Sequence, residues 1–150
     1  MIHPAQAKDV PALQRIVGET GLFPPDLLPE MIADHLAGEA GDIWLSCTVQ
    51  DHVAGFCYAV PEQMTDGVWN MLALAADPAR QRSGVGHKLV ADLEERLSAQ
   101  NARLIVVDTS SDAMFEGARA FYAKAGYTEE ARIRDFWGPG DDKITFRKAL

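Results

Sequence analysis

The sequence has few cysteines, no clustered histidines and no long apolar run. Only two of its 150 residues are cysteines, Cys47 and Cys57. Each lies in an apolar, strand-like run, which favours two reduced core thiols. The four histidines are scattered along the chain. Because a metal site needs several ligands at close spacing, none is expected.

The chain also lacks the segments that direct a protein to a membrane. A membrane-spanning helix needs about 20 consecutive apolar residues, and no run in this sequence approaches that length. The first six residues, Met-Ile-His-Pro-Ala-Gln, do not form the apolar core of a secretion signal. We therefore expect a cytoplasmic protein with no membrane partner.

Basic residues are scarce as well. The chain holds 14 Lys and Arg against 22 Asp and Glu, a net charge of −8. A nucleic-acid partner is not expected, because such partners require a basic face, whereas an acidic surface suits a cationic amine. The composition, 47% apolar and 24% charged, is typical of globular proteins, and the length fits one domain over residues 1–150.

Residues 74–90 form the stretch around which the chain is organised. An apolar strand ends at the turn Asp77-Pro78, because proline cannot continue a strand ladder. A basic loop with Gly84 and Gly86 follows, and then apolar residues recur every four positions, as on one face of a helix. The first turn of a helix has unpaired backbone N–H groups and a positive dipole end, so the loop predicts an anion site.

The pattern of this loop distinguishes between phosphate compounds. A dinucleotide fingerprint needs a third glycine, where Leu89 stands, and a P-loop needs Gly-Lys-Ser or Gly-Lys-Thr, which is absent. Residues 81–86 instead read Gln-Arg-Ser-Gly-Val-Gly. This segment resembles the acyl-CoA pyrophosphate loop of the GNAT acetyltransferases, Gln/Arg-x-x-Gly-x-Gly/Ala. The alternative is a turn before an ordinary helix start.

A second motif lies 32 positions further on, where residues 118–127 read Ala-Arg-Ala-Phe-Tyr-Ala-Lys-Ala-Gly-Tyr. It resembles the GNAT helix Ala-x-x-Phe-Tyr-x-Lys-x-Gly-Phe, with Tyr127 in place of the phenylalanine. The resemblance implies that Tyr122 lies near the thioester sulfur as a general acid. A phenol with a pKa of about 10 can donate a proton to a thiolate whose thiol has a pKa of about 8.5. The alternative is a half-buried ring that packs beside Phe121.

The order of predicted elements also matches that family. We expect strands at 2–4, 43–50, 53–61, 68–76, 104–109, 127–136 and 143–150, and helices at 9–18, 26–37, 84–100 and 115–125. Asp26 is a candidate cap of the second helix, and residues 137–142 are expected to be a loop. The fold class is α/β, a mixed and mostly antiparallel sheet of six to seven strands with helices on both faces. The resemblance implies a splay between strands four and five.

The resemblance assigns acetyl-CoA as the co-substrate and gives its binding residues. The backbone groups of Leu74 and Ala76 would bind the pantetheine arm, and a backbone N–H near Leu72 to Leu74 would stabilise the thioester oxygen. The loop would bind the pyrophosphate chiefly through its backbone, with Gln81, Arg82, Ser83, Gly84, Val85, Gly86 and His87.

A general base and the acceptor pocket are less defined. Many GNAT proteins have a glutamate on the fourth strand, and here Trp69-Asn70-Met71-Leu72 has none. Four carboxylates are candidates, with Asn70 as a residue that orients a water, and none is assigned: Glu62, Asp66, Asp108 and Glu116. The candidate acceptor-binding residues lie in or beside the variable segments, and the aromatic ones are equally compatible with the core or with a homodimer contact: Phe23, Trp69, Asn70 and Trp137.

The resemblance implies an N-acetyltransferase that transfers an acetyl group from acetyl-CoA, by direct attack, to a primary amine of a small molecule or a peptide amino terminus. The alternative is a catalytically weak GNAT-like module that binds acyl-CoA and acts by regulation, which the missing glutamate favours. Tyr122 and the complete loop favour the enzyme.

Overall fold

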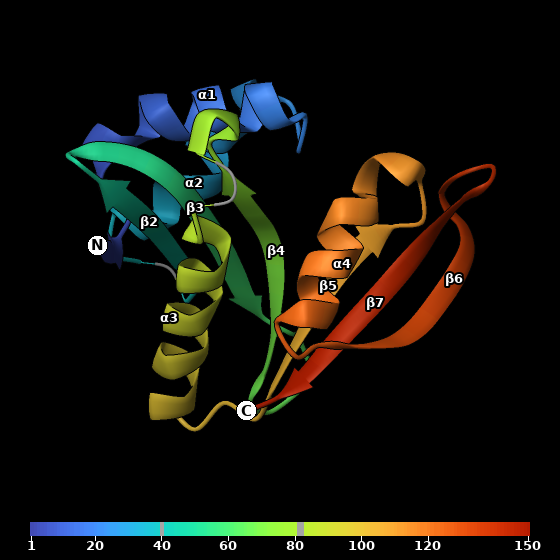
Figure 1. Ribbon diagram of the computed structural model, residues 1–150. Coiled ribbons are helices and arrows are strands. Elements are labelled where there is room, and N and C mark those ends of the chain that lie inside the picture. Colours follow the sequence, from blue (N-terminus) through green and yellow to red (C-terminus); the bar gives the residue numbers. More distant parts are fainter. Residues whose placement is uncertain (40, 81–82) are drawn as a thin grey trace.

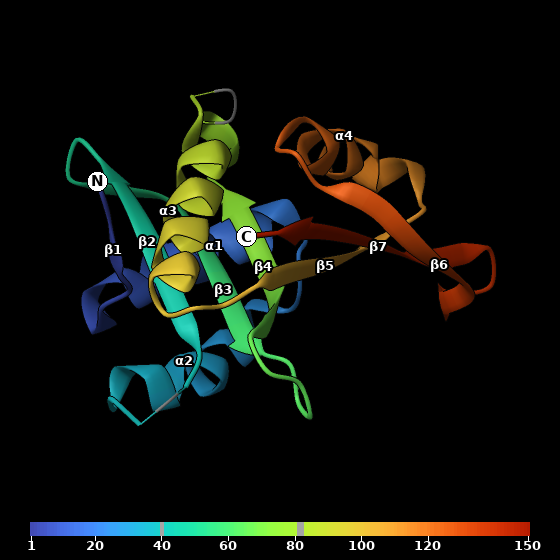
Figure 2. The ribbon, with the colours of Figure 1, turned by 90° about the horizontal axis from the view of Figure 1, so that it is seen from below.

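The computed structural model describes residues 1–39, 41–80 and 83–150. One sheet of seven strands runs through the molecule in the order β1-β2-β3-β4-β5-β7-β6, as Figure 2 shows, with β6 at the outer edge. The strands are β1 (Ile2–Pro4), β2 (Ile43–Val49), β3 (His52–Pro61), β4 (Val68–Ala76), β5 (Leu104–Ser110), β6 (Thr128–Gly138) and β7 (Asp141–Ala149). The helices are α1 (Val10–Thr20), α2 (Leu28–Leu36), α3 (Val85–Ala99) and α4 (Glu116–Lys124), with short 3₁₀ helices at Ala7–Asp9, Pro25–Leu27, Pro78–Arg80 and Ala113–Phe115.

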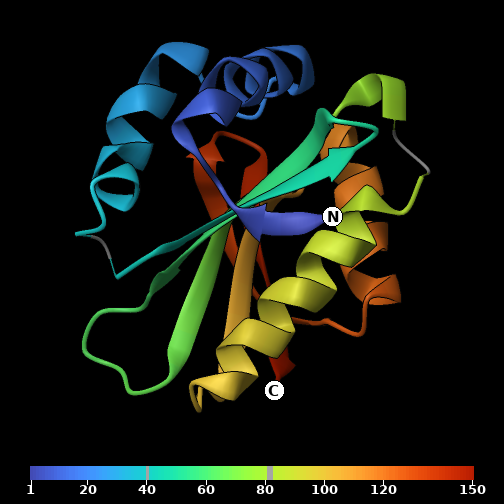
Figure 3. The ribbon, with the colours of Figure 1, turned by 90° about the vertical axis from the view of Figure 1, so that its left-hand side faces the viewer.

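The helices cover both faces of the sheet and enclose two separate apolar cores. Leu89 and Leu93 of α3 pack on one face together with Tyr122 of α4, while Leu13 of α1 and Ile32 of α2 pack on the other. Figures 1 and 3 show the two pairs of helices on opposite sides of the strands. No helix in the described ranges is long and apolar enough to cross a membrane.

The sheet opens between β4 and β5, the only parallel pair among the strands in the described part of the chain. The two strands pair over Val68↔Leu104, Trp69↔Ile105 and Asn70↔Val106. Beyond these residues β4 continues to Ala76 and β5 to Ser110 without pairing to each other, and Figure 1 shows them diverging. The predicted fold class and the splay between strands four and five are confirmed.

A β-bulge at Leu72 interrupts the alternation of β4 just where the strands separate. Tyr58 of β3 pairs with Ala73, but the next residue, Ala59, pairs with Met71, so Leu72 has no partner across the ladder. An extra residue in a strand reverses which face its neighbours occupy. Accordingly, Met71 packs in the core beneath α3, whereas Ala73 packs in the core beneath α1 and α2.

Three details of the sequence prediction were wrong. Asp26 lies within the 3₁₀ helix Pro25–Leu27 and does not cap α2, whose N-cap is Leu27, because the prolines start the turn earlier. The strand expected at 127–136 continues to Gly138, because β6 is still paired with β7 at Gly138↔Asp141. Residues 137–142 are mostly strand, because a turn at Pro139-Gly140, with Gly140 at φ +78°, joins β6 directly to β7.

Candidate active site

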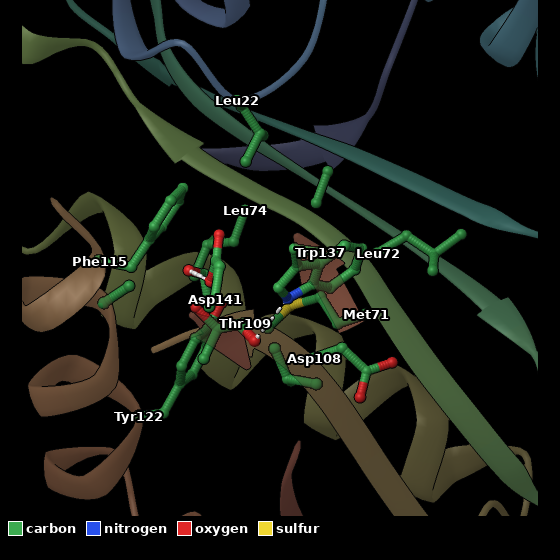
Figure 4. A pocket seen from close by; sticks show the side chains of 14 residues that line it. Leu22, Met71, Leu72, Leu74, Asp108, Thr109, Phe115, Tyr122, Trp137 and Asp141 are labelled. Atoms are coloured by element: carbon green, nitrogen blue, oxygen red, sulfur yellow. Dashed lines mark hydrogen bonds between the residues drawn. The ribbon is translucent and has the colours of Figure 1, made fainter. Parts of the chain in front are cut away.

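A cavity of about 360 Å³ lies at the opening between β4 and β5. Figure 4 shows side chains from several elements converging on it. Leu72 comes from β4, Asp108 from β5 and Tyr122 from α4. Leu22 reaches it from the segment after α1, and Trp137 from β6. The cavity is therefore built by segments that are far apart in the sequence. Their side chains meet in the space that opens where β4 and β5 separate.

A second hollow, of about 610 Å³, adjoins the first. It is lined by Ala76 at the end of β4, Gly86 at the start of α3, and Gly117 and Phe121 of α4. Leu74, Ala118 and Tyr122 line both hollows. We call the first hollow the splay cavity and the second the helix groove. Tyr122 therefore belongs to the wall that the two spaces share.

The helix groove begins at the glycine loop. Gly84 is the N-cap of α3 and has a φ of +81°, a conformation that glycine adopts without strain. The N–H groups of the first helical turn have no partner within the helix, so they can bind an anion at this end of the groove. Of the predicted loop residues, Ser83 to His87 lie at this helix start, and Gln81 and Arg82 lie outside the described residues.

Gly86 also lets α4 approach α3 closely. A Cβ at this position would lie 3.1 Å from Cε2 of Phe121, and the Phe121 ring packs at a tilt against His87 with centroids 4.4 Å apart. A side chain at position 86 would therefore crowd the contact between the two helices.

Asp77 fixes the turn that leads from β4 into this loop. Its Oδ2 accepts a hydrogen bond from Arg15 at 3.0 Å, and its Oδ1 accepts one from the Ala79 N–H at 3.0 Å. Its own N–H donates to the Ala54 carbonyl at 2.8 Å. The Arg15 guanidinium, followed by the Ala79 N–H, lowers the pKa of Asp77 below its ordinary value.

The substitution Asp77→Asn should lower the free energy of unfolding at pH 7 by about 0.5–1 kcal/mol, since it removes a partly exposed ion pair. Because the pKa of the folded carboxyl is lowered, its stabilisation is complete above the ordinary pKa of about 3.9 and disappears as the pH falls through the folded value. Urea unfolding at pH 7 and at about pH 3 should show the difference shrinking in acid. Glu19→Gln, which removes the exposed second partner of Arg15, serves as the control; a difference that did not depend on pH would contradict the prediction.

Tyr122 is held in place by aromatic neighbours. Its ring is 7% exposed and lies 5.4 Å from Phe121, 5.8 Å from Tyr127 and 5.7 Å from Phe146, between centroids. Burial raises the pKa of its hydroxyl above the ordinary value. The phenol is therefore protonated throughout the neutral range, which is the state that a proton donor requires.

The predicted acceptor-binding residues are placed differently from one another. Trp137 lines the splay cavity, is 52% exposed, and donates from Nε1 to the Thr109 carbonyl at 3.2 Å. Asn70 is buried and hydrogen-bonds to Glu62 and Asp108. Trp69 packs in the core on the α3 side, and Phe23 packs against the core of α1 and α2; neither lines the cavity.

The cavity also holds residues that the sequence analysis did not name individually. Leu22, Phe115 and Asp141 line it, and of these Leu22 and Asp141 lie in two of the variable segments, 21–25 and 136–142, from which the acceptor pocket was expected. Asp141 was assigned to a loop and in fact begins β7, so the turn Pro139-Gly140 in front of an alternating segment is the signal that would have placed it. Phe115 carries no comparable signal, because isolated apolar residues beside helices are common throughout the chain.

Comparisons with known proteins agree with this geometry. The model of the acetyltransferase (GNAT) family matches residues 12–127. A structure assigned to the GNAT family of acetyltransferases, from Desulfovibrio desulfuricans, has a TM-score of 0.91 and 30% sequence identity, covering 99% of this chain and 98% of that one. No curated protein matches significantly.

Two more distant structures share the fold. An aminoglycoside 6'-N-acetyltransferase complexed with coenzyme A has a TM-score of 0.79 at 18% identity, covering 99% of this chain and 96% of that one. A ribosomal-protein-alanine N-acetyltransferase from Brucella melitensis has a TM-score of 0.82 at 16% identity, covering 100% and 99%. The family model spans most of the chain and the Desulfovibrio structure nearly all of it, and so the protein belongs to the GNAT family of acetyltransferases.

Proposed function

We propose that this protein transfers an acetyl group from acetyl-CoA to a primary amine of a small molecule or a peptide amino terminus. The observation that supports it most is the meeting of the splay cavity and the helix groove at Tyr122. One space leads from an anion-binding helix start and the other opens toward carboxylates and aromatic rings. A two-substrate transfer needs two such spaces that meet at the reacting atoms.

The helix groove fits the proposed co-substrate. Backbone N–H groups at residues 83–87 would bind the pyrophosphate, where the helix dipole favours negative charge. The pantetheine arm would run along Leu74 and Ala76, since β4 has no pairing to β5 beyond Asn70 and its backbone can act there as an extra strand edge.

Two groups of the chain would serve the chemical step. When acetyl-CoA is bound, its thioester supplies the acetyl group and a thiol leaving group. The Tyr122 hydroxyl would donate a proton to the departing sulfur. The bulge at Leu72 leaves β4 backbone groups without ladder partners, so an N–H between Leu72 and Leu74 would hydrogen-bond the thioester oxygen as it gains negative charge.

The splay cavity supports an amine as the acceptor. Asp108 and Asp141 provide negative charge, while Leu72, Phe115 and Trp137 provide an apolar and aromatic wall. A cationic head on an apolar body fits this lining. We place this reaction in the cytoplasm on the sequence evidence given above, and a homodimer remains a proposal that light scattering would test.

The alternative is a regulatory module that binds acyl-CoA with little turnover. The absence of a glutamate from β4, where Asn70 and Met71 stand, favours it. The two functions differ in turnover rather than in binding.

Both functions require acetyl-CoA binding. Calorimetric titration with acetyl-CoA, with NAD and ATP as comparison ligands, tests that binding. We expect micromolar binding of acetyl-CoA and none of NAD or ATP. A measurement of thiol release from acetyl-CoA in the presence of a panel of primary amines then distinguishes the enzyme from the regulatory module. Release that depends on an amine supports the enzyme, binding without release supports the regulatory module, and absence of binding would overturn both.

A further inference from the structure

We propose that Asp108 binds the ammonium group of the acceptor and takes its proton. This inference rests on the proposed amine acetylation and assigns the proton acceptor that the fourth strand lacks. Asp108 lies on β5, two residues beyond the last residue that pairs with β4, and its side chain lines the splay cavity. Figure 4 shows Asp108 and Tyr122 on opposite sides of the cavity.

Neighbouring side chains hold the Asp108 carboxylate in place without using all of its acceptor sites. Thr145 of β7 donates to Oδ1 at 2.6 Å, and Nδ2 of Asn70 lies 3.4 Å from Oδ2. A carboxylate has about four lone-pair sites, so sites remain for an incoming ammonium. The carboxyl group is therefore fixed in position and still able to accept hydrogen bonds from the substrate.

Lys143 is the charged neighbour that bears most on this role. Its Nζ lies 3.8 Å from Oδ2 of Asp108, which is longer than a hydrogen bond, and 4.4 Å from the centroid of the Phe136 ring. The lysine thus keeps a cation near the carboxylate while its ammonium is oriented over an aromatic face. A substrate ammonium can approach the carboxylate more closely than Lys143 does.

The other carboxylates are less suited to this step. Asp66 and Glu116 are exposed and do not line the cavity. Glu62 accepts a hydrogen bond from Nδ2 of Asn70 at 2.9 Å and is likewise absent from the lining. Asp141 also lines the cavity, and its Oδ1 accepts a hydrogen bond from Ser110, whereas the Asp108 carboxylate is oriented from two strands, by Asn70 of β4 and Thr145 of β7. Asp108 alone among the four carboxylates that the sequence offered faces the same space as Tyr122.

The proton balance of the step is simple. One N–H bond of the ammonium breaks and its proton passes to the Asp108 carboxylate, which later releases it to solvent. The freed electron pair of nitrogen forms the N–C bond, and the C–S bond breaks. The sulfur takes a proton from Tyr122, and the second proton that nitrogen loses returns to Tyr122 through solvent. The net products are the amide, the thiol and one proton.

The test compares wild type with Asp108→Asn on two acceptors that differ in basicity. Phenethylamine is largely protonated at neutral pH, whereas its β,β-difluoro analogue is largely neutral and needs no proton acceptor before attack. We expect kcat/KM of the variant to fall about 10²-fold or more with phenethylamine, and clearly less with the difluoro analogue, while acetyl-CoA affinity stays unchanged in calorimetry. If the screen yields a better amine, the pair is made from that amine.

A matched control makes the same chemical change elsewhere. The control is Asp51→Asn. Asp51 lies in the exposed turn between β2 and β3, where its φ is +62° and asparagine is well tolerated. The kcat/KM values of this variant with the two amines should match those of wild type. Should Asp108→Asn fail to fold, Thr145→Val keeps the carboxylate and removes only its Thr145 donor, and it should show a smaller loss with the same dependence on amine basicity.

The outcomes distinguish the role of Asp108 from the proposed acetylation of an amine. An active wild type whose variants lose nothing, or lose equally with both amines, would overturn the role of Asp108 and leave the proposed function standing. A wild type that acetylates no amine would overturn the proposed function, and the role of Asp108 with it.

Discussion

Protein carrying Gly86→Glu should lose its affinity for acetyl-CoA by about 10²-fold or more. Gly86 is the second residue of α3 and lines the helix groove. A glutamate there would bring a carboxylate to the anion site, and like charges in contact cost several kcal/mol, where each 1.4 kcal/mol is tenfold in affinity. Calorimetric titration of the folded variant with acetyl-CoA measures this loss.

Companion variants separate charge from steric effects. The Cβ of any residue at this position lies 3.1 Å from the Phe121 ring, so Gly86→Ala reproduces the crowding without the charge and should cost much less affinity. Gly117→Phe approaches the groove from α4, where a new Cβ meets no atom within 4 Å; its ring should obstruct the groove without disturbing the helices. Unchanged affinity in Gly86→Glu would remove the pyrophosphate assignment.

Tyr122→Phe should lower kcat by about 10²-fold to 10⁴-fold, the usual contribution of a positioned proton donor. The ring contacts with Phe121, Tyr127 and Phe146 remain in the variant, so acetyl-CoA affinity should change by less than about threefold, a change no larger than the net contribution of about one hydrogen bond. Steady-state kinetics with a saturating amine, together with calorimetry, check both parts. A fully active variant would exclude the general-acid role.

The pH dependence of this effect has a definite sign. Burial raises the pKa of Tyr122, so the proton-donating form persists through the ordinary tyrosine range near pH ~10. The ratio of wild-type to Tyr122→Phe activity should therefore stay constant from neutral pH to about 10 and show no alkaline decline. Tyr127→Phe is the matched control: that hydroxyl donates to Glu94 at 3.1 Å and lines neither hollow, so its loss should affect stability and leave kcat unchanged.

Much of the fold follows from local signals in the sequence. The apolar run of β5 and the four-residue spacing of Val85, Leu89 and Leu93 have few alternative structures, and Gly126 follows the C-cap residue of α4. The described part of the first motif, residues 83–86, lies at the start of α3, and the second motif begins within α4 and ends just after it. Their contact through Gly86 and Phe121 brings together segments that are 35 residues apart, and no local pattern contains that contact.

The acceptor side depends on features that sequence patterns do not record. Four carboxylates were equivalent candidates until the strand pairing set Asp108 toward the splay cavity. Trp69 and Trp137 were equivalent candidates for the acceptor pocket, but only Trp137 lines the splay cavity. Trp69 lies on a paired segment of β4 and faces the core, whereas Trp137 lies on the edge strand β6. Burial and pairing between distant strands decided each case.

The bulge at Leu72 has a consequence for any comparison or redesign of this strand. Odd-numbered positions before it lie beneath α3, as Met71 does, and odd-numbered positions after it lie beneath α1 and α2, as Ala73 does. The number of residues in β4 is therefore as constrained as their identity. Deleting or inserting one residue here would exchange which apolar core each side chain enters over the rest of the strand, up to the turn at Asp77-Pro78. An alignment gap placed within β4 thus implies a rearranged splay cavity, even where every residue type is matched.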